Sequence, residues 1–399
     1  MAPRKPEQEP AGQHTAADVT FVILNWNGRA FLEVVLPTIF AQTATGFAVH
    51  VVDDASTDDS RAYVERSWPA ARFIAHQENV GITANMNRGI GSATTDYIAL
   101  LNNDLELAPN WLHEMRAALE AQPAAAAGDG KMLDYHRRDH IDGAGDLLTW
   151  AMLPGRRGNG ELDTGQYDEP QEVFSVSGGA ALLRRAAFED VGPFDSDLFA
   201  YYEDIDWGFR ARLLGYSALY VPTAIAIHMG SATTGRDPGR WAHLLPRNRI
   251  YVVAKDLPAP LLWRYLPRIL VSELFWLRVD LRNGLGLKHL KGWWQALGML
   301  PLALHKRRAI QSARRASIAS LRSAMTPAPS LWRSLRSRTA RARCPGSTAL
   351  LSNRQGEESP LAPGVSIPRL WAVTRTGRGF SPHSGCVHAS VGSRPHQGG

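Results

Sequence analysis

Cysteine is nearly absent from this chain. Of its 399 residues only Cys344 and Cys386 are cysteines, and both lie in the last quarter. The first three quarters can therefore hold neither a disulfide nor a thiolate metal site, which fits a reducing compartment. Residues 1–18 (MAPRKPEQEPAGQHTAAD) contain no apolar segment. We therefore expect no signal peptide and a cytoplasmic protein, either free or at the inner face of the cell membrane.

A uniform excess of positive charge is also missing, although the pI is 9.4. Residues 306–399 carry 16 basic and 2 acidic side chains, a balance of +14, whereas residues 1–305 carry 28 and 36, a balance of −8. A mildly acidic body thus precedes a strongly basic tail. The high pI reflects that tail and does not indicate nucleic-acid binding.

Four segments differ in composition. Residues 1–18 form a polar lead that we expect to be disordered. Residues 19–235 alternate short apolar runs with amphipathic stretches, and residues 236–310 have a helical pattern. Residues 311–399 are rich in Arg, Ser, Pro and Gly and lack periodicity. We expect this last segment to be a disordered Arg-rich tail, and a shifted reading frame would produce the same abrupt change in composition.

The pattern in residues 19–235 predicts an α/β fold with a parallel sheet. Strand-like runs at 19–24, 48–57, 71–76 and 97–104 alternate with helix-like stretches at 31–42, 83–93 and 109–123. Three polar clusters, NWNG, DDAST and NND, lie at the ends of such strands. Ligands of parallel sheets gather at the carboxyl ends of the strands, so these clusters are candidate binding residues.

The cluster Asn102-Asn103-Asp104 follows a buried strand and carries a single charge. Mg²⁺ and Mn²⁺ take oxygen ligands and often bind only one or two protein carboxylates beside substrate phosphates. Asp104 would suffice as such a ligand, and the two amides could bind sugar or ribose hydroxyls. The other clusters have simpler interpretations, since Asp, Ser and Thr in DDAST cap helices well.

Three acidic residues, Glu203, Asp204 and Asp206, crowd together at the start of an amphipathic helix. Helix capping explains part of this pattern, but clustered carboxylates also raise one another's pKa, which favours a general base. His228 ends the apolar run AIAIH. A lone histidine there is usually structural, whereas one that faces Asp104 would complete a metal site.

Residues 236–310 have two interpretations. Leu266, Ile269, Leu270, Leu274, Leu277 and Leu281 form one helical stripe with arginines beside it, and the uncharged run 292–304 is too short to span a bilayer. Paired tryptophans and basic flanks favour helices in a membrane interface, with peripheral membrane contact. Packing on the preceding domain is the commoner fate of such stripes.

Seven motifs together resemble glycosyltransferase family 2, and most closely its rhamnosyltransferase-like branch. The resemblance spans about residues 19–305. The motifs occur in the family's order and spacing: VTFVILNWNG, VVDDASTDDS, ENVGITANMNRGI, YIALLNND, VSGGAALLRRAAFEDVGPFD, YYEDIDWGFRARLLGY and IHMGSATT. The resemblance implies a GT-A fold, in which a Rossmann-like nucleotide-binding half is continuous with an acceptor half. Amphipathic C-terminal helices and the basic tail would follow.

The resemblance also implies roles for individual residues. The NND motif matches the family's D-x-D motif, with Asp104 and His228 as ligands of a divalent cation, Mn²⁺ or Mg²⁺, and Asn102 in place of the first acid. Asp204 of the ED motif corresponds to the catalytic base, with Glu203 beside it. Expected substrate contacts on the donor side are Asn25, Trp26, Asp54, Asn79, Gly81, Asn87, Asn102, Asn103, Gly178 and Gly179.

The implied activity is transfer, with inversion, of rhamnose or a hexose from a nucleotide-diphosphate sugar to a hydroxyl of a cell-envelope glycan or lipid-linked acceptor. A catalytically silent nucleotide-sugar-binding protein is the alternative, favoured by Asn102. A nicotinamide-dependent dehydrogenase is disfavoured, because the turn after the first strand reads NWNGRA and not G-x-G-x-x-G.

Overall fold

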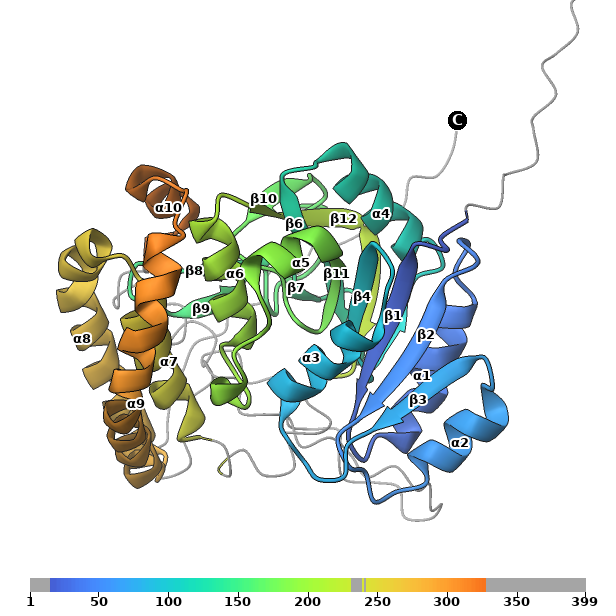
Figure 1. Cartoon of the computed structure of the whole chain (residues 1–399), viewed down its shortest axis with the longest axis horizontal. Coiled ribbons are helices and arrows are strands. Elements are labelled where there is room, and N and C mark those ends of the chain that lie inside the picture. The colour runs from blue at the N-terminus through green and yellow to red at the C-terminus, as the bar shows by residue number, and fades with distance from the viewer. Residues whose placement is uncertain (1–14, 231–238, 240–241, 328–399) are drawn as a thin grey trace, which may run out of the picture. The chain divides into compact units, whose positions relative to one another are not determined.

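The computed structural model describes residues 15–230, 239 and 242–327 (Figure 1). Its strands are β1 Val19–Asn25, β2 Ala48–Asp53, β3 Ala71–Ala75, β4 Tyr97–Asn102, β5 Leu105–Leu107, β6 Ala125–Asp134, β7 Ile141–Gly143, β8 Asp146–Leu148, β9 Pro154–Arg156, β10 Gln171–Val173, β11 Ala180–Arg184 and β12 Ser217–His228. Its helices are α1 Arg29–Phe40, α2 Ser60–Ser67, α3 Ile82–Ser92, α4 Trp111–Ala121, α5 Arg185–Val191, α6 Glu203–Leu213, α7 Leu244–Asp256, α8 Ala259–Arg282, α9 Gly286–Ser312 and α10 Ile318–Ala324. A 3-10 turn, η1, covers Ser196–Leu198.

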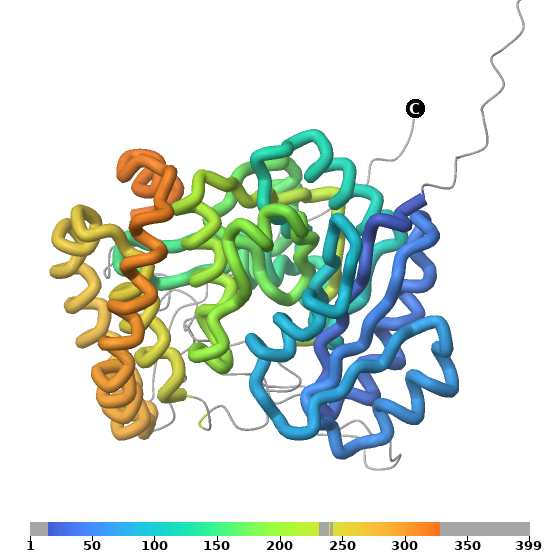
Figure 2. Tube along the Cα trace, viewed as in Figure 1, coloured from blue at the N-terminus to red at the C-terminus, as the bar shows by residue number. Residues whose placement is uncertain are grey.

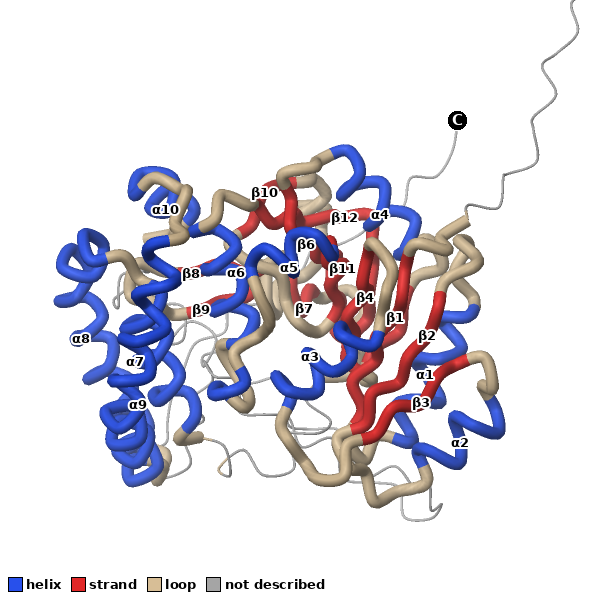
Figure 3. Tube along the Cα trace, in the orientation of Figure 1, coloured by secondary structure: helices blue, strands red, loops and turns tan. Residues whose placement is uncertain are grey.

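One mixed sheet organises the N-terminal two thirds, in the order β10-β12-β6-β11-β4-β1-β2-β3. The strands β3, β2, β1 and β4 are parallel neighbours, as the βα alternation predicted. Beyond β4 the prediction of a parallel sheet is wrong, because β11 runs antiparallel to both β4 and β6. The α/β fold itself is confirmed, and strands (red in Figure 3) lie between helices on both faces.

Alternating side chains of β1 explain why helices cover both faces of the sheet. Phe21 and Ile23 point into a core shared with α1 and α4, while Val22 and Leu24 point into a core shared with α3, α5 and α6. A central strand buried on both faces has this near-continuous apolar sequence. Both helical layers therefore leave the carboxyl ends of the parallel strands as the place for polar side chains.

The helices α7 to α10 build a third core against α6. Tyr251, Tyr265 and Ile269 are buried in it beside Phe209. A buried ion-pair network reinforces the contact, since Lys255 Nζ pairs with Asp206 of α6 and lies 2.6 Å from Asp195 Oδ2. The interpretation of residues 236–310 as helices packed on the preceding domain is thus correct for one face of these helices (Figure 2). Within the described residues, no helix is both long and apolar enough to cross a membrane.

The tail begins later than predicted. Residues 311–327 were expected to be disordered, but α9 continues to Ser312 and α10 follows. Leu321 and Met325 are 2% and 3% exposed, so two apolar anchors hold a segment whose composition is mostly Arg, Ser and Ala. Residues 328–399 and residues 1–14 of the lead lie outside the described residues.

Candidate active site

Three buried polar side chains join the ends of β1, β2 and β4. Asn25 Nδ2 donates to Asp53 Oδ1 over 2.7 Å, and Asn103 Nδ2 donates to Asn25 Oδ1 over 2.8 Å. Asn25 is 2% and Asn103 5% exposed. Asn25 and Asn103 were predicted to contact substrate. In the structure Nδ2 and Oδ1 of Asn25 and Nδ2 of Asn103 bond within the protein, where they brace the floor of the site. Gly28 crosses this floor so closely that a Cβ there would lie 1.9 Å from Asn103 Nδ2.

Asp54 fixes the loop that precedes α3. Its two carboxylate oxygens accept hydrogen bonds from the backbone N–H groups of Val80 and Gly81, over 2.8 and 3.1 Å. Burial raises the pKa of Asp54, although these N–H groups oppose the shift. Gly81 has φ of +85°, and a Cβ on it would lie 2.6 Å from the ring of Phe199, so only glycine fits this close approach. Asn79 is exposed on the same loop.

The remaining residues predicted on the donor side differ in solvent exposure and in their contacts. Trp26 and Asn102 are half-buried. The side chain of Asn87 both donates to Phe194 O and accepts from Phe194 N, over 2.8 and 2.9 Å, which ties α3 to the segment before η1. Gly179 O accepts the backbone N–H of Asn102 over 2.8 Å. At Gly178, a Cβ would lie 2.8 Å from Met86, so both glycines let their turn lie close to α3 and β4.

Asp104 and His228 meet because β5 pairs antiparallel with β12. The register places His228 opposite Leu105, the residue after Asp104. His228 Nε2 lies 3.4 Å from Asp104 Oδ2, and His228 Nδ1 lies 2.9 Å from Asp142 Oδ2. The side chains of Asp104 and His228 are 8% and 9% exposed. The structure therefore brings together the two residues that the sequence proposed as metal ligands, and it adds Asp142 behind them.

Asp104, His228, Asp142 and Arg156 alternate in charge, and their electrostatic attraction stabilises the arrangement. Burial alone would raise the pKa of Asp104, but the facing imidazole outweighs it and leaves that pKa below its usual value. Burial likewise works against the charged form of His228, yet Asp104 and Asp142 raise its pKa to about 9. Arg156 Nη1 lies 2.6 Å from Asp142 Oδ2. With His228, Arg156 lowers the pKa of Asp142 to about 2, against the effect of burial.

The acidic motif at the start of α6 lies near further carboxylates that sequence reasoning missed. Asp129 on β6 and Asp146 on β8 are 3% and 7% exposed. Burial raises the pKa of Asp129 to about 7, and the nearby charge of Asp204 adds to this effect. Burial and then Asp204 raise the pKa of Asp146 well above its usual value. Arg156 is the cation that all three carboxylates share.

Glu203 and Asp204 form the acidic pair itself. Burial raises the pKa of Asp204, while the backbone N–H of Ile205, 2.7 Å from Asp204 Oδ1, opposes the shift. Burial and the adjacent Asp204 raise the pKa of Glu203 to about 8. At neutral pH Glu203 is therefore mainly protonated, so it adds little negative charge beside Asp204.

The segment before this pair is strained. Phe199, Tyr201 and Tyr202 have φ of 64°, 69° and 71°, a region that costs non-glycine residues free energy and clusters at functional sites. Asn248 of α7, fully buried, compensates: its Nδ2 lies 3.1, 2.8 and 2.7 Å from the carbonyl oxygens of Leu198, Ala200 and Tyr201. The helix α7 thereby helps to aim Asp204. Neither Asn248 nor the strain has a signal in a single sequence.

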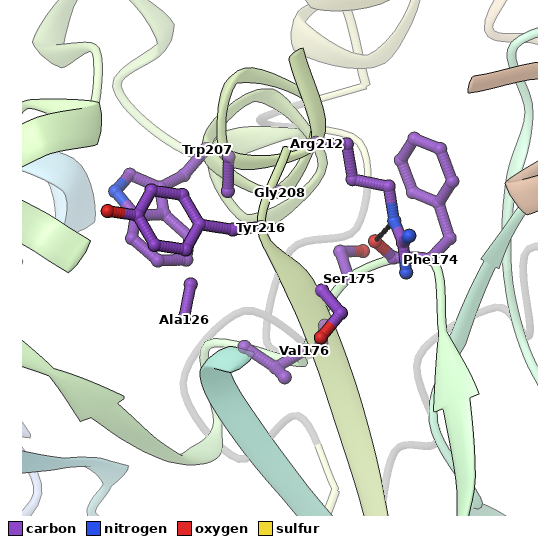
Figure 4. A pocket seen from close by; sticks show the side chains of 11 residues that line it. Ala126, Phe174, Ser175, Val176, Trp207, Gly208, Arg212 and Tyr216 are labelled. Atoms are coloured by element: carbon purple, nitrogen blue, oxygen red, sulfur yellow. Dashed lines mark hydrogen bonds between the residues drawn. The ribbon is translucent and has the colours of Figure 1, made fainter. Parts of the chain in front are cut away.

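A small cavity lies elsewhere, behind α6 (Figure 4). Trp207, Arg212, Tyr216 and Phe174 are among its lining residues, and Arg212 donates from Nε to Phe174 O over 2.9 Å. The lining contains no carboxylate. We therefore place the active site at the carboxyl ends of the strands and not in this cavity.

Asp104 and His228 suit a divalent cation as a pair. Carboxylate oxygen and imidazole nitrogen are ligands that Mn²⁺ accepts, and Asp142 at Nδ1 would hold the histidine in the orientation that exposes Nε2. Across the described ranges, no group of three or more such side chains forms a metal site on its own. The residues therefore fit a cation whose coordination substrate phosphates complete.

Comparisons with known proteins identify relatives of this chain. Residues 20–192 match the family model described as Glycosyl transferase family 2. Over 290 residues the chain is 27% identical to the N-acetylglucosaminyl-diphospho-decaprenol L-rhamnosyltransferase of Mycobacterium tuberculosis, covering 66% of this chain and 94% of that protein. It is 25% identical over 229 residues to the poly-beta-1,6-N-acetyl-D-glucosamine synthase of Staphylococcus aureus, covering 56% and 53%.

The fold has a parallel among solved structures. The crystal structure of GalNAc-T7 with UDP, GalNAc and Mn²⁺ superposes with a TM-score of 0.50 at 17% identity, covering 59% of this chain and 47% of that one. The α/β core and the site at its strand ends define a nucleotide-sugar-dependent glycosyltransferase of the GT-A fold. Residues 20–192 thus form a glycosyltransferase family 2 domain, and the identity to the M. tuberculosis rhamnosyltransferase supports the rhamnosyltransferase-like branch.

Proposed function

We propose that the protein transfers rhamnose or a hexose, with inversion, from a nucleotide-diphosphate sugar to a hydroxyl of a cell-envelope glycan or lipid-linked acceptor. One observation carries this proposal: Asp142 and Arg156 link the Asp104–His228 pair to the carboxylates around Asp204. The proposed diphosphate-binding residues and the proposed catalytic base would thus belong to one site. The rhamnosyltransferase of M. tuberculosis, whose name specifies a lipid diphosphate acceptor, supports the acceptor class.

On the donor side, Asp104 and His228 would hold a divalent cation, Mn²⁺ or Mg²⁺. When bound, that cation neutralises charge on the departing diphosphate. The floor formed by Asn25, Asp53 and Asn103 keeps the end of β4 in place beneath it. The loop locked by Asp54 and the half-buried Trp26 and Asn102 border the same edge and would contact the nucleotide and sugar.

On the acceptor side, Asp204 would take the proton of the attacking hydroxyl. The hydroxyl oxygen forms the new bond to the anomeric carbon as the bond to the diphosphate oxygen breaks, and the nucleoside diphosphate leaves with that electron pair. Attack from the opposite face inverts the configuration. Glu203, with a pKa of about 8, would stay mainly protonated beside the base at neutral pH and would leave the proton transfer to Asp204.

Calorimetry on the full chain tests this function. dTDP-rhamnose and UDP-hexoses are titrated with Mn²⁺ and again with EDTA. We expect one donor to bind with Mn²⁺ and to lose most of its affinity with EDTA. Binding that ignores EDTA would assign neutralisation of the diphosphate to the arginines and overturn the cation site. Binding of a donor without turnover on any acceptor would favour the catalytically silent alternative.

A further inference from the structure

The exposed large apolar side chains of the described residues are concentrated on two helices. Of the 12 such side chains, 11 lie between residues 263 and 304, on α8, on α9 or beside their turn. They are Trp263, Leu270, Val271, Leu274, Leu281, Leu287, Leu290, Trp294, Leu297, Leu302 and Leu304. Scattered surface apolar residues are normal, but a concentration of this kind marks an interaction site.

The exposed stripe of α8 lies opposite its buried face. Trp263, Leu270, Leu274 and Leu281 recur at intervals of seven, four and seven residues, which aligns them along one side of a helix. The side chains that α8 buries in the third core, such as Tyr265 and Ile269, stand about half a turn away. α8 is therefore apolar on two sides, and packing on the catalytic domain accounts for only one of them.

α9 repeats this arrangement. Leu287, Leu290, Trp294 and Leu297 are exposed, whereas Ala296 and Ala303 on the other side are fully buried. Trp294 is 76% exposed and Leu287 84%. His289 Nδ1 lies 2.7 Å from Asp280 Oδ2, and Trp293 Nε1 donates to Glu273 Oε2 over 3.1 Å. These contacts join α8 and α9 as an antiparallel pair. The pair lies at the left of Figure 1.

The same pair of helices is strongly basic. Residues 259–312 contain nine lysines and arginines but only two acids, Glu273 and Asp280. Both acids are engaged within the pair and with α7, since Glu273 also faces Arg249 at 3.0 Å. The basic side chains Arg264, Arg278, Arg282 and Lys291 are exposed beside the apolar stripes. The face thus combines tryptophan and leucine with uncompensated positive charge.

This combination selects among possible occupants. A second copy of the chain docking through the same face would bring like charges together. The segment 328–399 is itself basic, with few acids, so it is repelled by the rim. An anionic lipid surface complements both properties, because tryptophan and leucine enter the headgroup boundary while lysine and arginine pair with phosphates.

We propose that the α8–α9 face, defined by these exposed apolar side chains and their basic rim, docks the protein on an anionic lipid bilayer. The helices lie in the plane of the interface and do not cross it. This inference is independent of the donor and acceptor of the proposed function. For a lipid-linked acceptor it would keep the enzyme in the layer that contains its substrate.

Flotation of the full chain with vesicles tests the proposal. Vesicles of phosphatidylcholine alone are compared with vesicles that also contain phosphatidylglycerol. We expect strong binding only to the second kind. The double variant Trp263→Gln/Trp294→Gln should bind those vesicles at least about ten-fold more weakly, and Arg278→Gln/Arg282→Gln about five-fold more weakly per arginine at low salt. An unchanged circular dichroism spectrum and thermal midpoint show that each variant is folded.

Matched controls lie outside the face. Leu162→Gln removes the remaining exposed large apolar side chain, which is 50% exposed, and Arg66→Gln removes an exposed charge of α2. Both should bind vesicles like the wild type. Vesicle binding that survives Trp263→Gln/Trp294→Gln unchanged would overturn the proposal and assign binding to the basic tail. If light scattering shows a wild-type dimer that this double variant dissociates, with vesicle binding unaltered, the face is a self-association surface instead.

Discussion

Asn248 Nδ2 lies 2.7 Å from the carbonyl oxygen of Tyr201, two residues before the acidic pair of the active site. The same amide lies within hydrogen-bond distance of the Leu198 and Ala200 carbonyls. An amide nitrogen has two hydrogens, so these three acceptors share them. A side chain of the C-terminal helices thus stabilises left-handed backbone that the chain would otherwise avoid. The C-terminal helices therefore contribute to the geometry of the catalytic pair as well as to stability.

Replacement of Asn248 by Ala should reduce kcat about 100-fold while the donor dissociation constant stays near the wild-type value. The reason is that the strained segment relaxes and moves Asp204, and a displacement of about 1 Å can cost this much. Steady-state kinetics and donor calorimetry measure the two effects separately. Asn283→Ala, at the C-terminal cap of α8, is the control and should leave both unchanged. A parallel loss of donor binding and kcat would point to general destabilisation and contradict a positioning role.

Asp142 should influence metal binding without touching the metal. It accepts from His228 at Nδ1 and pairs with Arg156, so Asp142→Asn weakens the restraint on the imidazole. Loss of such a partner typically lowers metal affinity 10- to 100-fold. We expect a shift of about this size in the Mn²⁺ concentration that supports half-maximal turnover.

The control for this experiment is Asp134→Asn. Asp134 ends β6 and lies opposite His228 in the β6–β12 register, but its carboxylate pairs with Arg137, 3.0 Å away. It should leave the Mn²⁺ dependence as in the wild type. An Asp142→Asn enzyme with wild-type Mn²⁺ dependence would show that the histidine is held by the fold alone.

The strand ends were predictable from sequence because an apolar run that stops at polar residues is a local signal. β1, β2, β3 and β4 begin and end within a few residues of the predicted positions. Asp104 and His228 could be proposed as neighbours for the same reason, since each ends an apolar run. Their distance of 3.4 Å required the antiparallel pairing of β5 with β12, which no local pattern encodes.

The other side chains of the site could not be found this way. Asp142, Asp146 and Arg156 lie on strands of three residues, too short for a periodic pattern. Asn248 lies inside a helix, and the sequence of that helix does not distinguish an asparagine that binds backbone carbonyls from one on the surface. Asn25 and Asn103 are the residue types that the sequence led us to expect. In the structure, however, Asn103 Nδ2 donates a hydrogen bond to Asn25 Oδ1. Residue type identified the region, whereas tertiary contacts decided the roles.

Replacement of Asp204 by Asn should lower turnover by about 10²- to 10⁴-fold, the range of a lost general base. Donor binding should persist, because Asp204 belongs to the acceptor side. Glu203→Gln is the matched control: Glu203 has a pKa of about 8, so glutamine imitates its neutral form at pH 7 and most turnover should remain. Near-normal turnover of Asp204→Asn would contradict the assignment of the base.

The wild-type enzyme should show a matching pH dependence. Burial raises the pKa of Asp204, and a base works only when deprotonated. An ordinary aspartate titrates near pH 4. The acid limb of the kcat/KM profile should therefore lie above pH 4, and activity should fall as the pH is lowered through that limb. An acid limb at or below the ordinary range would contradict the raised pKa.

Asp129→Asn should stabilise the protein at neutral and alkaline pH. Burial raises the pKa of Asp129 from 3.8 to about 7, so the folded state holds a proton that the unfolded state releases near pH 4. The contribution of this carboxyl to stability is fully present below pH 4 and is lost as the pH rises towards 7. Asparagine keeps the shape and remains neutral. Its gain in free energy of unfolding should grow between about pH 4 and 7 and level off above, at no more than about 4 kcal/mol.

Urea unfolding at pH 5 and pH 8.5 measures this gain. Asp96→Asn is the control, because Asp96 is exposed and should change stability little at either pH. The acceptor for the backbone N–H of Ser177, now Asp129 Oδ2 at 3.0 Å, is retained by the asparagine side-chain oxygen, so this hydrogen bond is kept. A gain that is equal at both pH values would show that Asp129 ionises normally in the fold. A loss at pH 8.5 would mean that its charge is stabilised there, with Arg156 as the nearby cation that would do so.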